Sequence, residues 1–268
     1  MDATSVTPTT VTTARDVMTH FAAPGAQRAL AGWRADPRYT AVVPHVEGHA
    51  TRIVYRLTSA EIAEACELTA HALGTVERDR AESVEQIVDW NPAFAFTHLL
   101  HHIVEQTEAV PTWRDFVLYY RNNRMGRLML GDAVDERTRE LVENGFDERL
   151  VDDAMRWRIG NAYYSFLREL WVVVNLREAG VDVRIHPLAD ALLRVDAWCG
   201  QTALIIYVSN SKYRKGHTGR KIRAADLLRG ASPPFKIETV ELQPRKEYGK
   251  VHLPTQKSIL IVAARLRR

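Results

Sequence analysis

The sequence predicts a mixed α/β (α+β) fold, in which a mainly helical N-terminal domain precedes a mixed sheet flanked by helices. The chain has 268 residues, 46% of them hydrophobic, so it can build one large core or two smaller ones. Apolar residues recur at helical spacing through the first 150 residues, whereas a further helix and then strand-like runs follow from Trp157. We therefore expect a disordered lead-in at 1–15, a helical domain at 16–150 and an α/β domain at 151–268.

The N-terminal sequence, the short apolar runs and the small number of cysteines together indicate a soluble cytoplasmic protein. MDATSVTPTTVTTARD is rich in threonine and lacks the basic-then-apolar order of a signal peptide. The longest apolar runs, LWVVV and ALIIYV, are too short to span a membrane. Cys66 and Cys199 are too few for a disulfide framework, so we expect a reducing compartment and two buried, inert thiols.

Three helical segments dominate the N-terminal domain, and shorter ones follow at 135–144 and from Asp147. The three are LTSAEIAEACELTAHAL, AFAFTHLLHHIVEQ and TWRDFVLYYRNNRMGRLML, the last with Thr112 as its N-cap. Arg121, Arg124 and Arg127 recur at a spacing that gathers them loosely on one side of the third helix. A helix pair that reads DNA is one hypothesis, and an ordinary surface helix is the alternative.

The α/β domain is expected to open with the helix RIGNAYYSFLRELWVVVNLREAG, which Gly180 ends. VDVRI predicts a first strand and 191–198 a second. The turn CGQT leads into ALIIYVSNSK, so the second and third strands should form an antiparallel hairpin. RAADLLRG predicts a short helix, and FKIETVEL and SILIVAARL predict further strands. This order implies a mixed sheet with helices on its faces.

Charge is strongly segregated along the chain. From residue 201 onward there are 15 Lys or Arg against 4 Asp or Glu, whereas the first 200 residues hold 21 and 29. A basic C-terminal third predicts a polyanionic partner, because cations that neutralise phosphates release counterions. The densest stretch is KYRKGHTGRKIR, and a solubilising surface loop is the alternative interpretation. Its candidate phosphate contacts are Arg214, Lys215, Arg220, Lys221 and Arg223.

Acidic and polar side chains fall near the ends of the predicted strands. Glu169 lies beside the apolar stripe of the leading helix. Asp190 and Asp196 lie at the start and near the end of the second strand, and Asn210 and Lys212 close the third. Carboxylate and amide oxygens suit Mg²⁺, and Mn²⁺ can substitute. A lysine beside them would orient or help deprotonate an attacking water and stabilise charge on a phosphate, which is the equipment of phosphodiester hydrolysis.

Over about 157–266 the chain resembles the PD-(D/E)XK nuclease superfamily, which includes many restriction enzymes. The resemblance rests on the element order, on Glu169, on an Asp in the second strand, and on the triplet Asn210, Ser211, Lys212. It implies a restriction-endonuclease-like core that binds Mg²⁺ through its carboxylates and cuts DNA, less often RNA, with Lys212 as the motif lysine. Asn210 departs from the motif, where Asp or Glu is usual, and an uncharged amide lowers metal affinity.

The register of the predicted hairpin bears on which aspartate belongs to the site. With a three-residue loop around Gly200, Asp190 faces Asn210 and Asp196 faces Leu204. Asp196 would then lie about 20 Å from Asn210 along the strand, unless the turn is irregular. Both aspartates stay candidates, and a solvated residue at the sheet margin is the alternative for each.

These observations predict a Mg²⁺-dependent endonuclease that acts on DNA, with the N-terminal domain used for target binding or dimerisation. By analogy it would be a restriction or phage-defence enzyme, and cutting two strands would require a homodimer. One alternative is a non-catalytic nucleic-acid-binding protein with a degenerate nuclease fold. Another is a structural protein whose basic third meets an acidic partner. His98 and His102 have the spacing of metal ligands but lack an acidic third ligand, so we interpret them as ordinary surface or core histidines.

Overall fold

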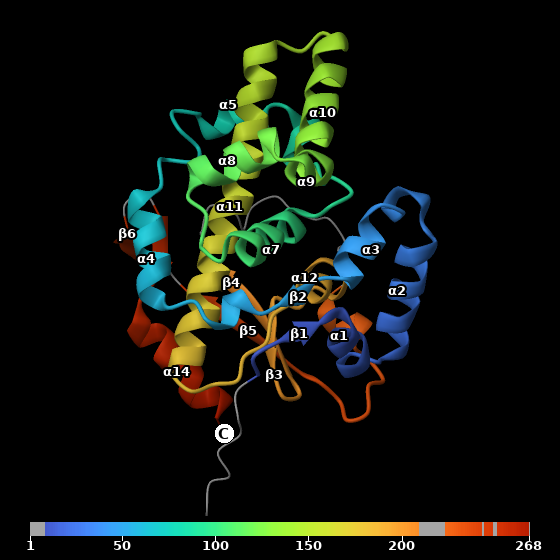
Figure 1. Cartoon of the computed structure of the whole chain (residues 1–268), viewed down its shortest axis with the longest axis vertical. Helices are drawn as coiled ribbons and strands as arrows, with labels where there is room; N and C mark the ends of the chain where they lie inside the picture. Colours follow the sequence, from blue (N-terminus) through green and yellow to red (C-terminus); the bar gives the residue numbers. More distant parts are fainter. Residues whose placement is uncertain (1–8, 209–222, 243, 249–250, 268) are drawn as a thin grey trace, which may run out of the picture.

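The computed structural model of the chain describes residues 9–208, 223–242, 244–248 and 251–267 (Figure 1). Helices dominate the first 150 residues, as the apolar periodicity predicts. The α-helices of this part are α1 (Ala14–His20), α2 (Pro24–Ala35), α3 (Val42–Glu47), α4 (Ser59–Leu68), α5 (Arg78–Glu82), α6 (Glu85–Val88), α7 (Phe96–Thr107), α8 (Trp113–Asn122), α9 (Arg124–Gly126) and α10 (Asp132–Glu143). Short 3₁₀ turns lie at η1 (Pro37–Tyr39) and η2 (Ile53–Tyr55), and η3 (Arg127–Gly131) is a π-helical turn.

One long helix, α11 (Glu148–Glu178), runs through the centre of the molecule and carries much of the core (Figure 1). Asp147 caps its start by accepting a hydrogen bond from the Leu150 N–H at 2.9 Å. Gly180, with φ of +78°, follows its end, as predicted. The expected boundary between residues 150 and 151 falls inside this helix, so the division into two domains stays a prediction.

A small mixed sheet follows α11 and confirms the broad fold class. Strand β3 (Ala197–Cys199) pairs antiparallel with β4 (Thr202–Val208), and β4 pairs parallel with β5 (Lys236–Leu242). The short helix α13 (Ala224–Leu227) lies between β4 and β5 in the sequence, as predicted. Two-stranded pairs are β1 (Thr12–Thr13) with β2 (Ala50–Thr51), and β6 (Pro244–Tyr248) with β7 (Val251–Pro254).

Three of the predicted strands are wrong in whole or in part. VDVRI contributes only an isolated bridge between Arg184 and Trp198. Most of 191–198 belongs to helix α12 (Pro187–Leu193) or to the bend after it, because His186 Nδ1 accepts from the Leu188 N–H and starts a helix. SILIVAARL lies in helix α14 (Gln256–Leu266), where the buried positions 259, 262 and 263 follow helical spacing.

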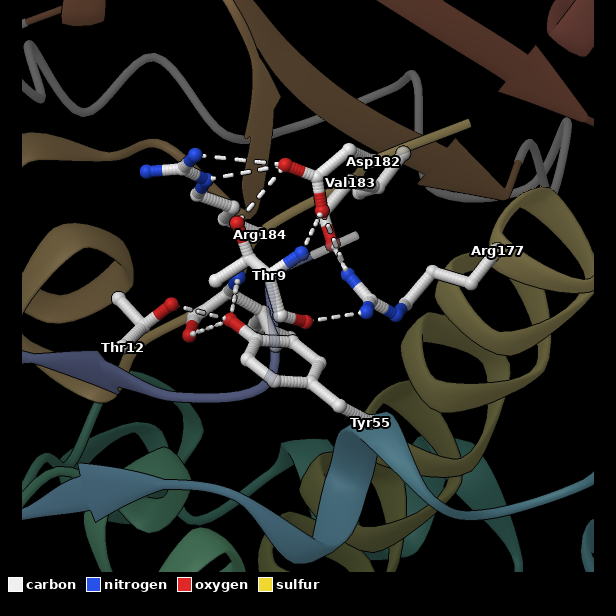
Figure 2. Close-up of polar contacts among 8 residues, drawn as sticks. Thr9, Thr12, Tyr55, Arg177, Asp182, Val183 and Arg184 are labelled. Carbon is white, nitrogen blue, oxygen red and sulfur yellow. Dashed lines mark hydrogen bonds and ion pairs between the residues drawn. The ribbon is translucent and has the colours of Figure 1, made fainter. Parts of the chain in front are cut away.

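Residues 9–15, predicted to belong to a disordered lead-in, instead form part of the folded core (Figure 2). The Thr9 N–H and hydroxyl both donate to the Asp182 carboxylate at 2.8 Å. Arg177 at the end of α11 donates to the Thr9 carbonyl and stacks over the Tyr55 ring at 4.1 Å. The start of the described chain is therefore joined to the C-terminal end of α11.

The length and apolar character of the helices and the state of the two cysteines can be read from the described residues. In the described part of the chain, no helix combines the length and the apolar character needed to cross a membrane. Both cysteines are free. Cys66 is buried as expected, and burial raises its pKa to about 12, whereas Cys199 is partly exposed.

Candidate acidic site

Three acidic side chains from three separate elements meet beside the β3–β4 hairpin. Glu169 comes from α11, Asp190 from α12, and Asp196 from the bend before β3. Each is partly exposed, and burial together with the negative charge on Asp190 raises the pKa of both other carboxyls. The sequence proposed all three residues, and we call them the acidic cluster.

The surroundings of Glu169 favour its neutral form. Withdrawal from solvent raises its pKa well above the usual range, and the charges on Asp190 and Asp196 raise it further. The Ser165 hydroxyl, one turn earlier on α11, and Arg168 offset part of this rise. At neutral pH a carboxyl in these surroundings either binds a cation or stays protonated.

Asp190 reaches the cluster from a helix, not from the strand on which the sequence analysis placed it. Burial raises its pKa, while the Thr97 hydroxyl of α7 and the positive charge of Arg194 act in the opposite direction. Because 187–193 is helical, the argument that Asp190 faces Asn210 across a hairpin is wrong.

Asp196 is fixed by the first residues of the hairpin. Its N–H donates to the Leu204 carbonyl at 3.1 Å, and its Oδ2 accepts from the Ile206 N–H at 2.6 Å. Burial and the nearby Asp190 raise its pKa to about 8. The hairpin pairs Ala197 with Leu204, so the expected pairing of Asp196 with Leu204 is off by one residue, and the carboxylate points further along β4.

The acidic cluster has the chemistry of a hard-cation site but not a completed ligand set. Carboxylate oxygens that repel one another in a partly dehydrated recess are stabilised by a cation such as Mg²⁺. Across the described ranges, no three His, Cys, Asp or Glu side chains are already arranged to hold a metal ion. Asn210 and Lys212, the other two predicted members, lie outside the described residues.

The arginines proposed to read DNA are not on one helix. Helix α8 ends at Asn122, and Asn123 caps the next helix by accepting from the Met125 N–H at 2.8 Å. Arg121 therefore lies on one helix, and Arg124 and Arg127 follow the turn. Arg127 makes ion pairs with Asp132 and Asp135, at 2.5 and 2.6 Å, which occupy its guanidinium. The expected shared face does not form, because the chain turns at Asn123.

Only Arg223 of the basic segment KYRKGHTGRKIR, at 212–223, belongs to the residues that the structure describes. Arg214, Lys215, Arg220 and Lys221 lie outside the described residues. Arg223 is exposed and immediately precedes α13. Its exposed position lets it meet a partner in solution, which keeps it a candidate phosphate contact.

A group of buried histidines lies next to the acidic cluster, and sequence reasoning found it only in part. His49, His98, His101 and His186 form this histidine cluster; the His49 ring centroid lies 5.1 Å from that of His186 and 5.8 Å from that of His101. Burial lowers the pKa of His49 to about 2, of His98 and His101 to about 3, and of His186 to about 4. His98 is a core residue, as interpreted from the sequence, but no local pattern indicated His49 or His186.

A cavity of about 480 Å³ opens beside α12, and no sequence pattern indicated it. Its lining includes the half-buried Trp33, Tyr39 and Leu192, the buried His98 and the exposed Arg194. Arg194 also lowers the pKa of Asp190 and Asp196, so the cavity adjoins the acidic cluster.

Comparisons with protein-family models, with curated proteins and with solved structures find no match to this chain. A function for it must therefore be inferred from the residues of the site themselves.

Proposed function

We propose that this chain is a divalent-cation-dependent endonuclease that hydrolyses phosphodiester bonds in DNA. Mg²⁺, or Mn²⁺ in its place, would bind the acidic cluster, with the Asn210 amide oxygen as a further ligand. Lys212 would orient the attacking water and stabilise the charge that develops on the phosphate. The restriction-endonuclease-like core, the role in restriction or phage defence, the homodimer and the cytoplasmic location belong to this proposal.

The observation that carries the proposal is the meeting of Glu169, Asp190 and Asp196. They come from a helix, a second helix and a strand margin, yet each carboxyl perturbs or is perturbed by another. Structural carboxylates are normally paired with cations or hydrogen-bond donors, whereas acids that raise one another's pKa are typical of functional sites. The basic C-terminal third supports a phosphate-bearing substrate.

The most direct test of this activity uses Lys212. Lys212→Ala should lower single-turnover cleavage of DNA at least ~100-fold with Mg²⁺ or Mn²⁺, as expected for one lost electrostatic group. DNA binding should survive, because the other cations of the basic segment remain. Lys257→Ala, which removes an exposed lysine from α14, is the matched control and should cleave like the parent. Equal cleavage by the Lys212 variant would contradict the proposed role.

A second candidate is a non-catalytic nucleic-acid-binding protein that keeps a degenerate nuclease fold. The specific support for it is that the described residues hold no ready-made ligand set, together with the uncharged Asn210 in the motif position. The same assay separates the two functions. DNA binding that weakens steeply with salt, without cleavage in either metal, would favour the binding protein.

A further inference from the structure

The cavity beside α12 has the size and the lining of a small-ligand pocket. Its volume of about 480 Å³ lies within the range of pockets that hold nucleotide-sized ligands. It is bounded by α2, η1, the start of α7, α12 and α13, so the pocket is built by elements from both halves of the sequence. The pocket is therefore formed by the packing of several elements and not by a single loop.

One wall of the cavity is aromatic. Trp33 and Tyr39 are both partly exposed, and their ring centroids lie 6.3 Å apart with planes inclined by 39°. The Arg38 guanidinium lies over the Tyr39 ring at 5.4 Å and occupies one of its faces. Trp33 has the larger ring of the two, and a planar heterocycle can stack on such a ring.

The lining of the cavity includes an uncharged imidazole. His98 is only 5% exposed, and burial lowers its pKa to about 3, so the ring is neutral at physiological pH. Within the described chain its nitrogens make no hydrogen bond of ordinary geometry, although the Pro187 backbone is close enough to raise its pKa slightly. Both ring nitrogens are closed to solvent, so the ring contributes an uncharged surface to the lining and no hydrogen bond to a ligand.

The lining of the cavity also includes a positive charge, that of Arg194. Arg194 has a left-handed backbone with φ of +59°, which non-glycine residues seldom adopt, and its side chain is exposed. From this position it borders both the cavity and the acidic cluster. Arginine suits phosphate because its planar group can donate two parallel hydrogen bonds.

We propose that this cavity holds one unstacked nucleotide of the substrate strand, with the base against Trp33 and above His98 and the phosphate at Arg194. The inference rests on the proposed phosphodiester hydrolysis, because the same phosphate chain would then pass the acidic cluster. The preferred substrate has a base free to leave its stack, as in a single strand, an end or a mismatch.

The test measures binding of a labelled single-stranded oligonucleotide and of the matching duplex, in EDTA so that no cleavage occurs. Trp33→Ala should weaken single-strand binding about tenfold, Trp33→Phe should restore most of it, and Arg194→Gln should also weaken it about tenfold. Duplex binding should change less than about threefold. Arg28→Gln removes an exposed charge from the same helix as Trp33 and should bind like the parent.

A second variant guards against a folding defect in Trp33→Ala. Ala191→Leu adds bulk to the cavity from α12 without removing a core contact, so it should cause the same loss while circular dichroism stays unchanged. Parent-like single-strand binding by the folded Ala191→Leu and Arg194→Gln variants would overturn the pocket. An equal loss on duplex and single strand would overturn it as well. Competition by free mononucleotides as strong as by the oligonucleotide would overturn the assignment to the substrate strand.

Failure of the pocket and failure of the proposed function give different results. If the parent cleaves DNA and the cavity variants bind and cleave like it, the pocket is wrong and the nuclease stands. If the parent binds single strands through Trp33 but never cleaves, the nuclease is wrong and the pocket stands. If the parent binds no nucleic acid, both are wrong.

Discussion

The acidic cluster and the histidine cluster meet at helix α12, which carries Asp190 and has His186 as its N-cap, yet their side chains respond to burial in opposite ways. His98 and His101 on α7 and His186 ahead of α12 are almost fully buried, and burial lowers the pKa of each so that it stays neutral. Asp190 on α12 shares its surroundings with two other acids and keeps access to solvent.

This difference is the reason that we propose a function for the acidic cluster and not for the histidine cluster. A histidine can enter the core by losing its proton, and at neutral pH no charge remains to be stabilised. Carboxyls with raised pKa values are different, since at neutral pH they must retain protons, repel one another or bind a cation. Of the two clusters, only the acidic one therefore predicts a bound cation.

The largest effect should come from removing a carboxylate. Asp196→Asn and Glu169→Gln should each lower cleavage at least ~100-fold, because a cation loses a charged ligand. Stability at pH 8 should stay level or rise, since like charges are removed and the amide oxygen introduced by Asp196→Asn can still accept from the Ile206 N–H. Asp152→Asn is the control, about 25 Å from Glu169 along α11 at the helical rise. A loss of cleavage that follows a loss of folding would count against a catalytic role.

The dependence of folding stability on pH should contain a contribution from the histidine cluster and an opposite one from the acidic cluster. Unfolded histidines take up protons below about pH 6.5, so each buried histidine destabilises the fold as pH falls, by about 1.4 kcal/mol per pH unit. The acids act in reverse, because the folded state holds protons that the unfolded state has released, and stability falls as pH rises towards the Asp196 pKa of about 8. The two effects oppose each other between about pH 4 and 6.5. Above about pH 6.5 only the acids still make stability depend on pH.

Urea unfolding in metal-free buffer should accordingly show a maximum near pH 6.5, with a decline towards pH 8 on the order of 1 kcal/mol. In Asp196→Asn that decline should shrink. A stability that keeps rising between about pH 6.5 and 8.5 would show that the acids do not repel one another in the folded chain.

A smaller effect is expected from the histidine cluster. His101 is 1% exposed, lies 5.4 Å from the Phe166 ring centroid, and has no hydrogen bond to either ring nitrogen in the described structure. His101→Phe should keep this ring contact and remove two unsatisfied polar atoms, raising the free energy of unfolding by roughly 1 kcal/mol. It should also weaken the acid side of the pH profile without altering cleavage. A loss of cleavage at unchanged stability would give the histidine cluster a functional role.

Local sequence signals predicted the parts of the fold that local interactions decide. Thr112 caps α8 as expected, and the CGQT turn joins an antiparallel pair. The strand predicted for SILIVAARL failed because a short apolar run fits either a strand or a helix, and packing against α11 decided for the helix. Arg121, Arg124 and Arg127 were grouped wrongly because one capping residue, Asn123, redirects the chain.

The sequence analysis named the three acidic residues, but it did not predict the elements that carry the two aspartates or that both aspartates would meet Glu169. Asp190 belongs to a helix that the sequence analysis missed, yet it still reaches Glu169 and Asp196. The cavity could not be predicted, because Trp33 and Arg194 lie far apart in the sequence and only the packing of α2 against α12 brings them to one pocket.

Cation binding by the acidic cluster is the central claim, and thermal unfolding with and without Mn²⁺ at pH 8 tests it most directly. A ligand that binds only the folded state raises the melting temperature, so saturating Mn²⁺ should stabilise the parent and Asp152→Asn by several degrees. Asp196→Asn should show little or no shift. Equal shifts in all three proteins would place the cation elsewhere and contradict cation binding at the acidic cluster.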